Sequence, residues 1–258
     1  YGNTVLMRAA QNGDEAGVRF LLRHHANVRA DNKEGQEPIH FAALSGNVAT
    51  IRLLKNNGAK RKIADANRYT PFHMAVATGN LDAANMLFFP GAQNRITKNK
   101  ESPLHSALQT SKLPLVQFLL DKEAQLDVPD KFGQYPVHIA VRDPKLLRML
   151  LEKGANVNVK ESSGQTPLHF AAASGLDESA KLLLDAGATV DERDDYGQTP
   201  FHQVITNLRH RGDAAIPTAD VLLAHGADPT IDLEGKNPLR FATEPLKTHL
   251  KMKLDIGR

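Results

Sequence analysis

The chain has 258 residues, of which 41% are hydrophobic and 24% charged, a balance typical of a globular protein and not of a disordered chain. It contains no cysteine, which excludes disulfides, thiolate catalysis and cysteine-based zinc sites, and no apolar run is long enough to form a membrane span. The formal net charge of +3 is too small to indicate nucleic-acid binding.

A short motif of proline, an apolar residue, histidine, any residue and alanine recurs along the chain. Six copies keep the histidine, and two degenerate copies flank them. In chain order the copies are Val5–Ala9, Pro38–Ala42, Pro71–Ala75, Pro103–Ala107, Pro136–Ala140, Pro167–Ala171, Pro200–Val204 and Pro238–Ala242. Most begin 32 or 33 residues after the copy before, and a period in this range is the signature of a repeat protein.

Each motif predicts the start of a short helix. In four copies threonine or serine precedes the proline, which places an N-cap residue before proline at the first helical position. These residues are Thr70, Ser102, Thr166 and Thr199. In four copies a glycine follows the first motif residue by eight positions, where it would end the helix after about two turns. These glycines are Gly13, Gly46, Gly79 and Gly175.

A second helix is predicted after the first in each repeat, because leucine occupies one aligned position in seven repeats. The leucines are Leu21, Leu54, Leu87, Leu119, Leu150, Leu183 and Leu222. A Gly-Ala pair or its relic follows, which suits a left-handed helix end, and the next residues are rich in Asp, Asn, Gly and Lys, as in an exposed hairpin. Such a helix pair cannot bury its apolar side alone, so neighbouring units must stack into a solenoid.

These motifs resemble those of the ankyrin-repeat family. The copy at 164–172, with the sequence GQTPLHFAA, is close to the family consensus, and eight copies cover essentially the whole chain. The resemblance implies an all-α solenoid of stacked helix-turn-helix units with projecting hairpin loops, in which hairpins and first helices form a concave face. We expect a single domain over 1–258, with repeats near 1–30, 31–63, 64–96, 97–128, 129–159, 160–192, 193–231 and 232–258, the last as a C-terminal cap.

Two regions depart from the regular repeat. The seventh repeat gains six residues within Asn207–Ile216, either as a functional loop or as a tolerated insertion. After Pro238, Leu250 and Leu254 alternate with lysines, which fits a capping helix with a polar outer face. Because the chain begins inside a motif, we also expect it to be a fragment of a longer protein.

The sequence offers no catalytic or cofactor-binding motif: phosphate-binding glycine loops, zinc-protease, serine-hydrolase and EF-hand patterns are all missing. The motif histidines repeat once per unit and would stack as a ladder, whereas a metal site needs converging ligands. They are His40, His73, His105, His138, His169 and His202. We therefore interpret them as structural, and expect no catalytic residue, no metal and no cofactor.

The predicted hairpins differ in charge. Residues 58–70 and 91–102 carry formal charges of +3 and +2, whereas residues 188–199 and 227–237 carry −3 and −2. The hairpin edge should therefore be basic around the third and fourth repeats and acidic near the seventh and eighth. This pattern indicates either a polarised docking edge or a solvated surface whose charges happen to segregate.

Aromatic residues at predicted hairpin tips suggest a binding function. Tyr69, Phe132 and Tyr196 would anchor a partner there or pack onto the neighbouring hairpin. Small side chains dominate the predicted concave floor, with Gln109 and Arg142 as polar groups. We therefore predict a non-catalytic scaffold that binds a partner protein or peptide through the concave face and hairpin tips. The candidate contact residues are Lys33, Tyr69, Lys98, Gln109, Phe132, Arg142, Arg193 and Tyr196.

Two other functions remain open. The chain could be a regulatory or targeting segment of a larger enzyme, channel or secreted bacterial effector, and the basic third and fourth repeats could recognise a phosphorylated or nucleotide ligand. We expect a monomer that neither inserts into a membrane nor binds nucleic acid. The expected location is intracellular, in the cytoplasm or nucleus, or in a host cytoplasm if the chain belongs to a bacterial effector.

Overall fold

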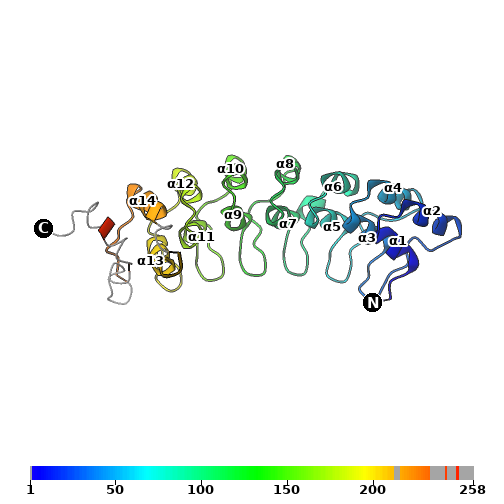
Figure 1. The fold of residues 1–258 in the computed structure, drawn as a ribbon, viewed down its shortest axis with the longest axis horizontal. Helices are drawn as coiled ribbons and strands as arrows, with labels where there is room; N and C mark the ends of the chain where they lie inside the picture. Colours follow the sequence, from blue (N-terminus) through cyan, green and yellow to red (C-terminus); the bar gives the residue numbers. More distant parts are fainter. Residues whose placement is uncertain (1, 212–215, 233–241, 243–247, 250–258) are drawn as a thin grey trace. The chain divides into compact units, whose positions relative to one another are not determined.

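The structure, a computed structural model, describes residues 2–211, 216–232, 242 and 248–249 (Figure 1). It divides into two compact units, Tyr1–Lys131 and Phe132–Arg258. Residues 212–215 of the seventh-repeat insertion and most of the predicted capping helix lie outside the described residues. The single domain over 1–258 and its repeat boundaries stay a prediction.

Unit 1 contains four helix pairs, each followed by a loop. The first helices of the pairs are α1 (Val5–Gln11), α3 (Pro38–Ser45), α5 (Pro71–Ala77) and α7 (Pro103–Gln109). The second helices are α2 (Glu15–Arg23), α4 (Val48–Asn56), α6 (Leu81–Leu87) and α8 (Leu113–Asp121), with a short 3₁₀ helix η1 (Ala92–Asn94) after α6. Within this unit the first helices form one row and the second helices another, and the long loops extend on the side of the first helices (Figure 1).

Unit 2 repeats this arrangement in three pairs: α9 (Pro136–Ala140) with α10 (Pro144–Glu152), α11 (Pro167–Ser174) with α12 (Asp177–Asp185), and α13 (Pro200–Arg211) with α14 (Ile216–Ala224). The seventh-repeat insertion begins as helix and not as a loop, because α13 continues to Arg211. No strand occurs in the described residues, and the all-α helix-turn-helix prediction is confirmed. Within the same residues, no helix combines the length and apolarity that crossing a membrane would require.

The helices start where the motifs predict. Thr70 and Thr166 have extended backbone, and Pro71 and Pro167 follow at the first helical position. Proline suits this position because its fixed φ is helical and its missing N–H would have no partner in the first turn. The motif therefore sets the start of each first helix by local chemistry alone.

The core lies between the two helix rows of each unit. Motif alanines are fully buried at Ala42, Ala75, Ala107, Ala140 and Ala171, and so are the aligned leucines Leu54, Leu87, Leu119, Leu150, Leu183 and Leu222. The alanines let successive first helices approach closely, as α1, α3, α5 and α7 do in unit 1 and α9, α11 and α13 do in unit 2. Each buried leucine contributes on the order of 2 kcal/mol, mostly through contacts with a neighbouring repeat.

The motif histidines His73 and His169 each join the start of a first helix to the loop that follows the same helix pair. Nδ1 of His73 accepts a hydrogen bond from the backbone N–H of Thr70 (3.2 Å), and Nε2 lies 2.9 Å from the carbonyl of Arg95. His169 repeats the pattern with Thr166 (3.1 Å) and the carbonyl of Gln198 (3.0 Å). Because Nδ1 accepts, Nε2 carries the proton and donates, so the fold uses the neutral imidazole. In the described part of the chain, no set of three or more His, Asp or Glu side chains could hold a metal ion.

A ladder of backbone hydrogen bonds fixes the hairpin loops against one another. Unit 1 has three such backbone bonds: from the N–H of Ala66 to the carbonyl of Glu34 (2.8 Å), from Lys98 to Asn67 (3.0 Å) and from Lys131 to Asn99 (2.9 Å). In unit 2 the N–H of Ser162 donates to Phe132 (3.2 Å) and that of Asp195 to Ser163 (3.0 Å). One bond per step holds each loop tip in register with the next, so the loops are ordered platforms.

Two glycines of unit 2 test the importance of this close approach. Both have left-handed backbone, with φ of +78° at Gly133 and +84° at Gly154. A Cβ added to Gly133 would lie 2.6 Å from the backbone nitrogen of Ser162, whereas a Cβ added to Gly154 would have no atom within 4 Å. Both alanine variants should lose about 1 kcal/mol from the left-handed backbone, and Gly133→Ala should lose a further 1–3 kcal/mol or so from the clash. Urea unfolding of the two variants measures the difference, and equal losses would contradict the ladder's role.

The buried histidines predict a fall in stability at mildly acidic pH. Burial is the main cause that lowers the pKa of His40, His73, His169 and His202 below the ordinary value of 6.5. Below that value the unfolded chain binds more protons than the folded chain, so stability is complete above pH 6.5 and is lost as the pH falls through the folded pKa values. We expect the melting temperature, followed by circular dichroism, to hold steady above neutral pH and to drop by a few degrees or more toward about pH 5.5. A constant melting temperature across this range would contradict the neutral-histidine ladder.

Candidate protein-interaction surface

The hairpin loops of Asp65 and Asp194 each turn around that buried carboxylate. Oδ1 of Asp65 accepts hydrogen bonds from the backbone N–H of Asn67 (2.9 Å) and Tyr69 (2.8 Å). Oδ1 of Asp194 does the same for Tyr196 (3.0 Å) and Gln198 (2.8 Å). Because these carboxylates are buried and hold the turn together, they are not available on the outer surface for contacts with a partner.

The acidic edge predicted in unit 2 is therefore weaker than its formal charge suggests. Asp194 is 6% exposed, and its Oδ1 accepts hydrogen bonds within its own turn. Glu192 pairs with Lys160, with 2.6 Å between Oε1 and Nζ, and Asp191 accepts the backbone N–H of Asp228 at 3.1 Å. Three of the four carboxylates in residues 188–199 are engaged, which leaves Asp195 as an exposed acidic group of this loop.

Two aromatic side chains stand at hairpin tips of unit 2. Phe132 is 58% exposed and Tyr196 is 70% exposed. Each lies four positions before the motif proline of its repeat. Ser163 holds the same position in the hairpin between them. Since backbone bonds from Ser162 and Asp195 lock these three tips in register, the aromatic rings are presented by a fixed frame.

Tyr69 lies elsewhere than the tip predicted for it. It is half-buried at the entry to α5, two positions further along the loop than Phe132 and Tyr196 are in theirs. Its hydroxyl lies 3.2 Å from Oε2 of Glu101 in the next loop, and its ring meets His73 edge-on at 6.0 Å. Burial, and then the carboxylate of Glu101, raise the pKa of Tyr69. Tyr69 therefore packs onto the neighbouring hairpin, and Asn67 occupies the tip position of its loop.

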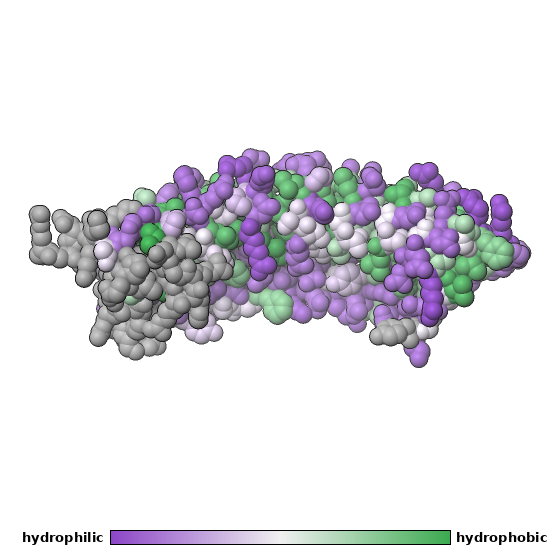
Figure 2. Space-filling model, in the orientation of Figure 1, coloured by the Kyte–Doolittle hydropathy of each residue, from purple (hydrophilic) through white to green (hydrophobic). Residues whose placement is uncertain are grey.

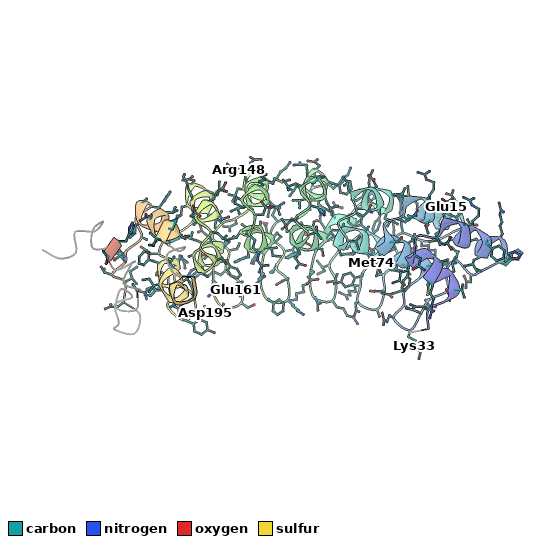
Figure 3. All side chains as sticks on the ribbon, in the orientation of Figure 1. Glu15, Lys33, Met74, Arg148, Glu161 and Asp195 are labelled. Carbon is teal, nitrogen blue, oxygen red and sulfur yellow. The ribbon has the colours of Figure 1, made fainter. Side chains whose placement is uncertain are left out.

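The polar candidates are exposed and fall on both units. In unit 1, Lys33 and Lys98 lie on hairpin loops and Gln109 ends α7; Lys33 points away from its loop (Figure 3). In unit 2, Arg142 follows α9, and Arg193 donates from Nη1 to the carbonyl of Gly197 at 3.3 Å. Within unit 2 the structure places Arg193 in the same hairpin as Tyr196.

One exposed aromatic residue was missed by sequence analysis. Phe20 on α2 is 62% exposed, and its ring lies 4.4 Å from that of His24. Purple, hydrophilic residues cover much of the face drawn in Figure 2, with smaller green, hydrophobic areas among them. Little in the sequence indicates that Phe20 is exposed, because the residues at its aligned position in later repeats are also apolar and are half-buried there.

Comparison with known proteins agrees with this architecture. The family model for ankyrin repeats matches three times, over residues 6–98, 90–161 and 143–232. No curated protein sequence matches the chain. The crystal structure of the human ASB11 ankyrin repeat domain is similar with a TM-score of 0.73 at 27% identity, covering 88% of this chain and 100% of that one. The ankyrin repeat domain of Bcl-3, described as a unique member of the IkappaB protein family, has a TM-score of 0.64 at 27% identity, covering 81% and 99%.

Ankyrin repeats are generally protein–protein interaction modules, and their domains are typically non-catalytic. The repeated motifs, the paired helices with projecting loops, and the family matches over residues 6–232 agree with one another. The chain belongs to the ankyrin-repeat family.

Proposed function

We propose that the chain is a non-catalytic scaffold that binds a partner protein through its hairpin tips and the adjoining ends of its first helices. The observation that carries this proposal is the pair Phe132 and Tyr196, two large aromatic rings exposed at equivalent tips of unit 2. Aromatic side chains are enriched at protein interfaces, and truncating one that acts as a hot spot costs about 2 kcal/mol or more of binding free energy.

The fixed frame beneath the rings supports this role. A partner that orders a mobile loop loses affinity to the entropy of ordering, whereas a preformed loop avoids that cost. The backbone bonds from Ser162 and Asp195 hold the tips in place before any partner arrives. The small side chain of Ser163 between the aromatic tips leaves room for a partner group to reach both rings.

In unit 2, Arg193 lies in the same hairpin as Tyr196 and would set the orientation of the partner by offering a guanidinium group to its carboxylates or carbonyls, and Arg142, after the end of α9, offers another. Unit 1 is a candidate surface by itself, with Lys33 and Lys98 on its loops and Gln109 at the end of α7 as donors. Rim charges of this kind contribute more to specificity and association rate than to affinity. Tyr69 would act by supporting its loop through Glu101.

The experiment is affinity capture from a lysate of the source cells with quantitative mass spectrometry. Wild type is compared with Phe132→Ser/Tyr196→Ser, which copies the residue at position 163, and with Phe20→Ser as a control at an equally exposed aromatic on α2. Proteins held by wild type and by the control should fall about tenfold or more with the tip variant, and a purified captured protein should show the same loss by calorimetry. Circular dichroism melting checks that all three proteins are folded.

Two outcomes would contradict the proposal. Equal retention of every captured protein by wild type and the tip variant would remove the rings from the binding surface. Loss of the same proteins with Phe20→Ser would show that exposed apolar area in general, and not the hairpin tips, drives capture.

A further inference from the structure

Helix α6 of unit 1 ends earlier than every other second helix described. It has seven residues, whereas α2, α4, α8, α10, α12 and α14 have nine each. Pro90 disfavours helical backbone in the residue before it, and the chain already leaves the helix at Phe88 with φ −59° and ψ 142°. The last turn that the other repeats form is missing here, and its carbonyl groups need other partners.

The early end also turns Phe89 inward. Phe89 is 4% exposed, although its aligned positions hold mainly polar or charged residues. Those residues are Arg23, Asn56, Asp121, Glu152, Asp185 and Ala224. This repeat therefore carries a buried ring and open helix-end carbonyls at a place where its neighbours carry a solvated helix end.

Four cations gather around this feature, and we name them the cationic cluster: Lys55, Arg61, Lys62 and Arg95. Lys55 Nζ donates to the carbonyl of Met86 at 3.1 Å, and Arg61 Nη1 donates to that of Phe88 at 3.0 Å. Lys62 Nζ and Arg95 Cζ lie 5.5 and 5.8 Å from the centre of the Phe89 ring, within reach of cation–π attraction.

The charge of the cationic cluster is not neutralised by acidic side chains. No ion pair found among the described residues includes any of the four. Carbonyls and a ring orient the cations but leave their formal charge in place. Burial is the main cause that lowers the pKa of Lys55, and the positive charges of Arg61 and Arg52 lower it further.

We propose that the cationic cluster is a docking surface for an acidic segment of a partner protein, one with several Asp or Glu side chains close in sequence. The negative charges of such a segment would complement the four positive charges, none of which is neutralised by an ion pair within the described ranges. The guanidinium of Arg95, which is exposed, can bind a carboxylate through two parallel hydrogen bonds. Because carbonyls and the Phe89 ring already hold the side chains, little further ordering is needed on binding.

The geometry favours a row of carboxylates over a single phosphate or a nucleic acid. The backbone here presents carbonyl oxygens, whereas phosphate sites in proteins use converging backbone N–H groups. Separate side chains on an open surface suit a ligand whose charges are also spread along a chain. The overall charge of +3 provides little of the long-range field that nucleic-acid binding requires.

The test is fluorescence anisotropy with a labelled oligoglutamate peptide and the whole chain at low salt. The variant Lys62→Gln/Arg95→Gln changes two exposed cations, and the control Lys145→Gln/Arg148→Gln removes the same charges from α10 of unit 2, where Arg148 projects from the helix (Figure 3). Wild type and control should bind the peptide equally. The cluster variant should bind about tenfold more weakly or worse, and added salt should weaken the wild-type complex.

Three outcomes would overturn the proposal. They are no binding of oligoglutamate by wild type at low salt, an equal loss in the control variant, and tighter cluster-dependent binding of an oligothymidylate or a phosphoserine peptide of equal charge. Melting curves show whether each variant is folded. Because the hairpin-tip rings lie in unit 2 and this cluster in unit 1, either proposal can fail while the other stands.

Discussion

A pair of helices this short can bury its apolar side only against another pair, and the rest of the structure depends on that constraint. The first helices reach each other through fully buried alanines such as Ala75 and Ala171, and the second helices contribute buried leucines such as Leu87 and Leu183. Stability is therefore distributed over the interfaces between neighbouring repeats, as in repeat proteins generally. Polar links follow the same stacking, since His73 and His169 each bond to a carbonyl of the following loop.

The loops inherit their order from this stacking. Side chains such as Asp65 and Asp194 close each turn, and single backbone bonds tie each loop to its neighbour. Some residues that look like free surface charge in the sequence, such as Asp65 and Asp194, are consequently part of the scaffold. This arrangement explains why the repeat can vary its tip residues, from Asn67 to Phe132 to Tyr196, without changing the fold.

Where a repeat breaks the pattern, it creates chemistry that the regular units lack. Pro90 shortens α6, and cations from α4, from the loop before α6 and from the loop after it lie around the resulting carbonyls and the buried Phe89. No regular second helix of the described residues could do this, because its last turn carries polar side chains into water. A helix shorter by two residues thus gives this repeat of unit 1 a basic surface.

The sequence by itself determined the repeat period, the helix starts at Thr-Pro or Ser-Pro, the buried alanine and leucine positions and the family, because these depend on local capping chemistry and on apolar residues at aligned positions. It also located Phe132 and Tyr196 on exposed tips. Tertiary structure alone decided that Tyr69 leans on Glu101, that Glu192 pairs with Lys160, that α13 runs on to Arg211, and that four cations meet around Phe89. Those outcomes depend on contacts between side chains about a whole repeat apart in the chain, or on where a helix ends. Neither follows from local sequence, because both are decided by how neighbouring repeats pack.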